Sequence, residues 1–162
     1  WDDLITGSVP EKYFIPTKLC LCHSENSEAF YGWFEELMDD KLPHRKMMEV
    51  EIADTAIRLY DIAGYYTINF DTVVIPPYDR PNSVLGEFLV LHLMISNAME
   101  GHRKNKLDDF FGNIVAAINQ CWGMASVRGL DLAGAIEEKR AFNATREDHK
   151  IENRSAPEGK GY

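Results

Sequence analysis

Long runs with helical periodicity dominate the 162-residue chain, and no segment shows the convincing apolar–polar alternation of a half-buried strand. Charged, proline-containing or glycine-containing connections separate the runs, which we expect at 16–38, 47–66, 84–103, 107–128 and 132–143. Residues 73–82 contain three prolines, so this stretch is predicted to be an extended link. The sequence therefore predicts an all-α fold.

A single compact domain is expected, because a chain of this length can bury one proper core. The predicted boundaries are an irregular lead-in over residues 1–15, the domain over 16–146 and a polar tail over 147–162. The run at 84–103 is apolar nearly all round, which predicts that it is the most buried helix.

The formal charge of −9 argues against a nucleic-acid partner and against an anionic membrane surface. It remains compatible with a nucleotide if a cation mediates the contact. No apolar stretch is long enough for a membrane span, and no secretory signal is visible. The three cysteines are odd in number and lack metal-site spacing, so we expect reduced core thiols in a cytoplasmic protein.

Two pairs of acidic residues stand three positions apart within predicted helices: Glu25 with Glu28, and Glu51 with Asp54. This spacing puts the members of each pair about one turn apart on one helix face. Four carboxylates brought together repel one another unless a cation lies among them, and a hard divalent ion such as Mg²⁺ is the simplest candidate. The alternative is that each pair lies on an ordinary solvated helix face, and the spacing alone leaves both open.

A weak internal repeat suggests how the helices are grouped. Ala98-Met-Glu-Gly101 matches Ala29-Phe-Tyr-Gly32 at an offset of 69 residues, and residues 128–131 match 68–71 at an offset of 60. Two helical hairpins of this kind predict a four-helix core with a short additional C-terminal helix. In this register the four acids correspond to Met94, Asn97, Phe111 and Ile114, so one hairpin alone would carry ions. The alternative is a chance similarity between two hairpins.

Glu25-x-x-Glu28, followed after 22 residues by Glu51-x-x-Asp54, resembles the motif of the MazG-like all-α nucleoside triphosphate pyrophosphohydrolases. These are relatives of the dimeric dUTPases and dCTP pyrophosphatases. The segment 139–146 resembles the basic element with which that family reaches phosphate and sugar. The resemblance spans about 18–146, and the tail-bearing form looks like phage-encoded members. Asn26-Ser27 and the proline-rich link depart from the family pattern, which leaves the base pocket open.

The resemblance implies Mg²⁺-dependent hydrolysis of a nucleoside triphosphate to a monophosphate and pyrophosphate, with Mn²⁺ able to substitute. It implies catalytic and metal-binding roles for Glu25, Glu28, Glu51 and Asp54. It implies substrate binding by Lys139, Asn143 and Arg146, whereas on charge alone the two cations fit an ordinary helix end.

Three further charged residues are candidates for an outer substrate shell, with solvated or surface ion-paired side chains as the alternative: Lys18, Arg58 and Asp61. Trp33, Phe34 and Trp122 have the ring chemistry to stack on a base, although such spacings are more typical of core residues.

Purine deoxynucleotides such as dGTP are the first expectation for the substrate, by analogy with phage relatives. A dUTP-specific or dCTP-specific pyrophosphatase and a non-catalytic nucleotide-binding helical bundle are the alternatives. The resemblance also implies a homo-oligomer, dimer or tetramer, in the cytoplasm, which is the host cytoplasm if the protein is phage-encoded.

Overall fold

The computed structural model describes residues 11–79 and 81–145, which form five helices and no β-strand. The helices are α2 (Glu11–Phe34), α3 (Met47–Tyr65), α4 (Val84–Arg103), α5 (Leu107–Val127) and α6 (Leu132–Thr145). The predicted all-α fold, with a four-helix core and a short C-terminal helix, is confirmed. No described helix combines the length and apolar character needed to cross a bilayer.

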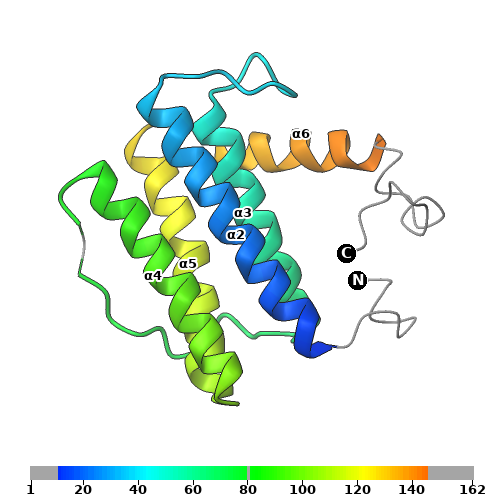
Figure 1. Ribbon diagram of the computed structural model, residues 1–162, viewed down its shortest axis with the longest axis vertical. Helices are drawn as coiled ribbons and strands as arrows, with labels where there is room; N and C mark the ends of the chain where they lie inside the picture. Colours follow the sequence, from blue (N-terminus) through cyan, green and yellow to red (C-terminus); the bar gives the residue numbers. More distant parts are fainter. Residues whose placement is uncertain (1–10, 80, 146–162) are drawn as a thin grey trace.

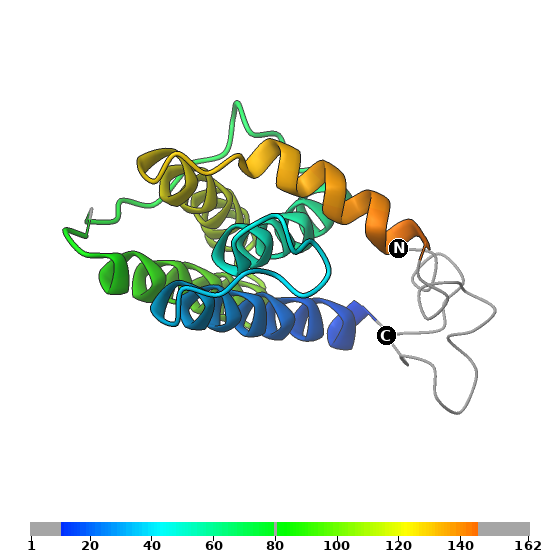
Figure 2. The same ribbon diagram turned by 90° about the horizontal axis from the view of Figure 1, so that it is seen from above.

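The helices pack as two antiparallel hairpins, α2 with α3 and α4 with α5 (Figure 1). Seen from above, α2 and α4 form one layer and α3 and α5 form a second (Figure 2). Helix α6 packs on the outer side of α3, away from α2, and runs across the direction of the other four.

The first helix differs from its prediction at both ends. It begins at Glu11, five residues early, and accommodates Pro16 in its interior, because burial of Phe14 and Ile15 offsets the lost backbone hydrogen bond. It ends at Phe34, four residues early, because Glu36 takes a left-handed φ of 55° that the helix cannot continue through. The remaining lead-in, residues 1–10, and residues 146–162 lie outside the described part of the chain.

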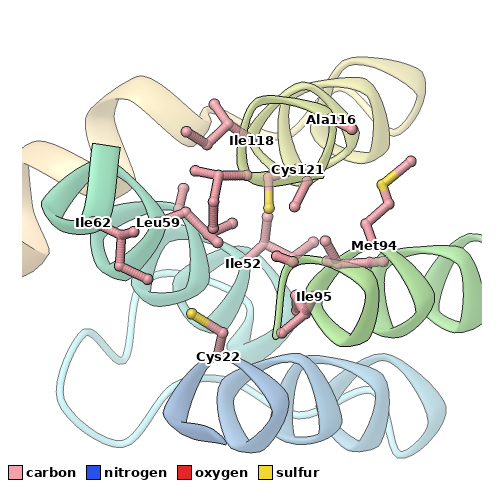
Figure 3. Packing of buried hydrophobic residues seen from close by; sticks show 14 of the residues in the cluster. Cys22, Ile52, Leu59, Ile62, Met94, Ile95, Ala116, Ile118 and Cys121 are labelled. Carbon is pink, nitrogen blue, oxygen red and sulfur yellow. The ribbon is translucent and has the colours of Figure 1, made fainter. Parts of the chain in front are cut away.

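The core lies between the two layers and is made mostly of aliphatic side chains. Ile52 and Leu59 of α3, Ile95 of α4 and Ile118 of α5 are almost completely excluded from solvent (Figure 3). Each such side chain contributes about 1.5–3 kcal/mol on burial, so packing rather than helix propensity fixes how the layers meet.

Helix α4 is not the most buried helix, contrary to its all-round apolar character. Leu85, Leu89 and Leu93 are about half exposed along its outer face. Helix α5 is buried over more of its surface, because α3 and α4 flank it and the link before α4 covers it. The backbone of that link approaches so closely at Gly112 that a Cβ there would lie 2.4 Å from the Val74 carbonyl oxygen.

The ends of α2 and α4 have the same geometry at the offset of 69 residues. The Leu37 N–H donates to the Gly32 carbonyl over 2.9 Å, and the Lys106 N–H donates to the Gly101 carbonyl over 2.9 Å. The residue before each of these donors has a φ of 55°. The two hairpins therefore turn in the same way.

In the first layer, His23 and His92 are also 69 residues apart, and their Nδ1 atoms lie 2.7 Å apart between α2 and α4. In the second layer the relation between the hairpins is imperfect. Helix α3 has 19 residues and α5 has 21, so an offset of 60 that fits their beginnings does not fit their ends.

The two glycines of α5 predict opposite effects of the same substitution. Gly112→Ala should lower the free energy of unfolding by about 1–3 kcal/mol, because the added methyl group collides with backbone atoms. Gly123→Ala meets no atom within 4 Å and should raise the free energy by about 0.5–1 kcal/mol. Urea denaturation of the two variants measures both changes. Equal effects would contradict the close packing of the link on α5.

Candidate functional site

Three of the four predicted acids meet between α2 and α3. Glu25 and Glu28 come from α2 and Glu51 from α3, and one carboxylate oxygen from each lies within 4.8 Å of the others. Glu25 and Glu51 are 8% and 5% exposed, whereas Glu28 is exposed. A solvated helix face therefore does not describe Glu25 and Glu51, and the cluster opens to solvent at Glu28.

Local sequence explains why the acids converge. Each pair stands at helical i,i+3 spacing, and α2 and α3 pack side by side in opposite directions. The fully buried Ala29 and Ala53 next to the acids have small side chains, which allow close approach of the two helices.

Asp54, the fourth acid, is paired with Lys139 of α6. The Lys139 Nζ lies 2.8 Å from the Asp54 Oδ2, and the lysine side chain is only 4% exposed. Burial by itself lowers the pKa of Lys139, but the adjacent Asp54 carboxylate outweighs it and the pKa of Lys139 rises. Lys139, predicted to contact phosphate, thus neutralises an acid within the protein.

Two further ion pairs continue along the contact between α2 and α3. Arg58 donates to the Glu25 Oε1 through Nε at 2.8 Å and Nη2 at 2.5 Å. Lys18 lies 3.2 Å from the Asp61 Oδ2. The predicted outer shell therefore lies beside the acidic cluster, with its charged groups already paired.

Charge compensation at the cluster is incomplete. Arg58 balances Glu25 and Lys139 balances Asp54, whereas Glu28 and Glu51 form no ion pair with any described residue. Burial and the neighbouring carboxylates raise the pKa of Glu51 to about 8, although Lys139 opposes this shift. Burial and the charge of Glu25 also raise the pKa of Glu28. A divalent cation held by oxygen ligands would supply the missing charge.

The predicted basic element is only partly described. Asn143 lies one helical turn after Lys139, and its buried Oδ1 accepts no hydrogen bond within the described part of the chain. Arg146 lies outside the described residues.

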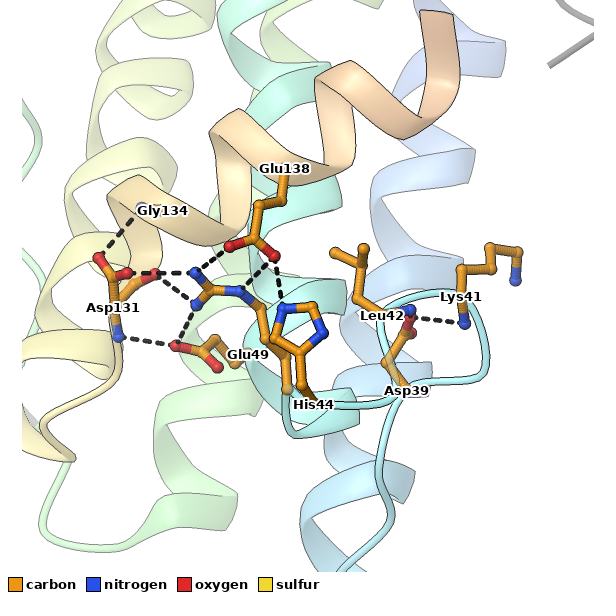
Figure 4. Close-up of polar contacts among 9 residues, drawn as sticks. Asp39, Lys41, Leu42, His44, Glu49, Asp131, Gly134 and Glu138 are labelled. Atoms are coloured by element: carbon orange, nitrogen blue, oxygen red, sulfur yellow. Dashed lines mark hydrogen bonds and ion pairs between the residues drawn. The ribbon is translucent and has the colours of Figure 1, made fainter. Parts of the chain in front are cut away.

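Arg45 fixes α6 against the beginning of α3 through Glu138, Glu49 and Asp131. Figure 4 labels these three acids. The Arg45 guanidinium donates to Glu138 through Nε at 3.1 Å and Nη2 at 2.9 Å, and through Nη1 to Glu49 at 3.1 Å. It also contacts Asp131, whose Oδ1 accepts from the Gly134 N–H and caps α6. Because Lys139 follows Glu138 directly, this cluster also sets where Lys139 enters the acidic site.

A fifth acid near the site comes from the loop between α2 and α3. Asp39 is 2% exposed and accepts from the N–H groups of Lys41 and Leu42, whereas its buried Oδ2 has no hydrogen-bond partner among the described residues (Figure 4). Asp39 is close enough to contribute to raising the pKa of Lys139. Neither Asp39 nor Arg45 was predicted from the sequence, because their charged loop has no periodicity to separate buried from solvated residues.

The second hairpin has no equivalent acidic cluster within the described residues. Asn97, which corresponds to Glu28, donates to the Tyr78 hydroxyl over 2.8 Å, and that hydroxyl also bonds Asn113. Tyr78 belongs to the link before α4, so the link packs over the place related to the acidic site.

Comparisons of the chain with models of known protein families, with curated proteins and with solved structures give no match.

The raised pKa of Glu51 predicts a pH-dependent stability of the metal-free protein. Between about pH 4.5 and 8 the folded protein holds a proton that the unfolded chain releases, so the free energy of unfolding should fall as pH rises. The slope is at most about 1.4 kcal/mol per pH unit for one proton. Denaturation of wild type and Glu51→Gln across this pH window measures the slope of the free energy of unfolding against pH.

The control for this pH dependence is Glu100→Gln. Arg103 and Lys104 lower the pKa of exposed Glu100 to about 2. Its contribution to the free energy of unfolding therefore changes only between about pH 2 and 4.5, where it rises with pH. The Glu100 variant should keep the wild-type slope above pH 5. An unchanged slope in Glu51→Gln would show that Glu51 does not carry it.

The Arg45 cluster predicts the local stability of α6. Arg45→Gln should speed hydrogen exchange of the α6 amides by about tenfold, since hydrogen bonds to charged groups contribute about 1.5–3 kcal/mol and the acids here are partly exposed. Arg103→Gln breaks an exposed pair within α4 and is the matched control. If both variants left α6 exchange unchanged, the Arg45 cluster would not hold the helix.

Proposed function

We propose that the protein is a Mg²⁺-dependent nucleoside triphosphate pyrophosphohydrolase that converts a (d)NTP to the monophosphate and pyrophosphate. The observation that carries the proposal is the meeting of Glu25, Glu28 and Glu51, with an oxygen of each within 4.8 Å of the others. The resemblance of the acid motif to MazG-like enzymes supplies the reaction type.

The donor set supports a hard divalent ion. All three groups are carboxylates, which suit Mg²⁺ and Mn²⁺ and disfavour soft metals. Glu28 is exposed, so the cluster is accessible from the side on which a triphosphate would approach. A bound divalent ion would neutralise phosphate charge and lower the pKa of a water molecule.

The remaining residues have supporting roles in this proposal. Arg58 orients Glu25 through two hydrogen bonds, and Lys139 pairs with Asp54 beside the cluster, which opposes the rise in the pKa of Asp54 that burial causes. The Asn143 Oδ1 accepts no hydrogen bond from a described residue, and in this proposal it is the acceptor for a sugar hydroxyl. In the reaction a water oxygen bonds to the α-phosphorus, the bond to the α–β bridging oxygen breaks, and the water proton is released.

Purine deoxynucleotides such as dGTP are the first candidates for the substrate, with dUTP or dCTP as alternatives. The proposal includes a homo-oligomer in the cytoplasm, or the host cytoplasm for a phage-encoded protein. Light scattering measures the oligomer, and a panel of common (d)NTPs with Mg²⁺ or Mn²⁺, scored for monophosphate and pyrophosphate, measures the substrate.

The exposed member of the cluster gives the direct test. Glu28→Gln should reduce pyrophosphate release by about a hundredfold or more, because it removes one charged ligand from the cluster. Circular dichroism should be unchanged, since Glu28 forms no ion pair with a described residue. Glu137→Gln, at an exposed position of α6, is the control that should retain activity.

The alternative of a non-catalytic nucleotide-binding bundle makes different predictions for the same proteins. It allows Mg²⁺ with nucleotide to raise the melting temperature of wild type, but without product formation. The absence of both product and thermal shift would reject the enzyme and the nucleotide-binding bundle together.

A further inference from the structure

A cavity of about 710 Å³ lies between α3, α5 and α6, and no role described above uses it. Its volume falls within the range of small-molecule sites, and its lining combines apolar side chains with a few polar groups. The lining includes Ile57, Tyr60, Asp61, Trp122, Ile136 and Arg140.

The cavity adjoins the acidic site, because the same two helices contribute neighbouring residues to both. On α6, Lys139 contacts Asp54, whereas the next residue, Arg140, lines the cavity. On α3, Asp61 lines the cavity about 10 Å further along the helix axis than Asp54. Arg58 lies between them in the sequence. A single extended ligand can therefore reach from the carboxylates into the cavity.

Two aromatic side chains, Tyr60 and Trp122, line the cavity. The Trp122 Nε1 donates to the Tyr60 hydroxyl over 2.9 Å, so the indole N–H has a partner inside the protein. Phe70 stacks on Tyr60 with ring centroids 6.2 Å apart. Tyr60 and Trp122 are nevertheless each 39% exposed. Exposed aromatic surface of this kind suits a planar ring, and nucleobases stack on such surfaces.

The charged groups of the cavity indicate which base fits. Asp61 contacts Lys18 through Oδ2, and Arg140 forms no ion pair with a described residue. A carboxylate accepts two parallel hydrogen bonds, and guanine alone among the common bases presents two adjacent donors, N1–H and the N2 amino group. An arginine matches O6 and N7 on another edge of the same base.

We propose that this cavity holds the base of the nucleotide and selects guanine, with Asp61 accepting from N1–H and the N2 amino group. Arg140 donates to O6 and N7. This inference rests on the proposed function and adds a specificity-determining pair to it.

The experiment compares kcat/KM for dGTP, dITP and dATP in wild type and in Asp61→Asn. Inosine lacks the N2 amino group, so wild type should prefer dGTP over dITP by about tenfold. Asp61→Asn should lose this preference, and the loss should appear in KM rather than in kcat. Asp71→Asn, at an exposed acid in the turn that follows α3, should behave as wild type.

Arg140→Gln provides a second variant at an exposed position, should Asp61→Asn fail to fold. Wild type should discriminate against 7-deaza-dGTP, which lacks the N7 acceptor, by about tenfold. The Arg140 variant should lose that discrimination and retain kcat.

The outcomes separate this inference from the proposed function. If wild type hydrolyses all bases equally, or the dGTP/dITP ratio survives Asp61→Asn, guanine selection is overturned and the pyrophosphohydrolase stands. If wild type hydrolyses no nucleotide, the proposed function fails, and calorimetric titration with dGDP tests the cavity alone. Binding that depends on Asp61 then supports the cavity as a guanine site, and no binding overturns it.

Discussion

Repulsion among the carboxylates at the contact between α2 and α3 is the constraint around which the molecule is organised. Burial strengthens the repulsion, because a charge removed from water has lost the solvent that screens it. The chain balances Glu25 with Arg58 and Asp54 with Lys139, whereas Glu28 and Glu51 have no cationic partner among the described residues. In the metal-free protein, protonation of Glu51, whose pKa burial raises to about 8, relieves part of this repulsion.

The position of α6 links this electrostatic balance to the rest of the structure. Arg45 fastens the first half of α6 through Asp131 and Glu138. Lys139, one residue after Glu138, enters the acidic site. Arg140 then lines the neighbouring cavity. A short helix with little apolar surface is therefore held by charge at one end, and it contributes to two adjoining sites because successive residues point in different directions.

The two hairpins share a geometry but differ in use. Their first helices end with the same backbone turn, yet the second hairpin has Met94 and Ile114 in its core where the first has acids. Tyr78 from the proline-rich link bonds Asn97 at the related place. One hairpin thus carries charge near solvent, while the other supplies apolar surface that stabilises the pair.

The sequence by itself determined the helical class, the limits of the later helices within two residues, and the placing of each acidic pair on one helix face, because periodicity and i,i+3 spacing act within one helix. The tertiary contact between α2 and α3 then brought Glu25, Glu28 and Glu51 together. Only the tertiary structure decided that Asp54 is balanced by Lys139, that Pro16 lies inside a helix, and that the outer face of α4 is exposed. It also decided that Tyr60 and Trp122 border one cavity. These features depend on contacts between distant segments, and the local pattern of a helix does not encode which neighbour covers each of its faces.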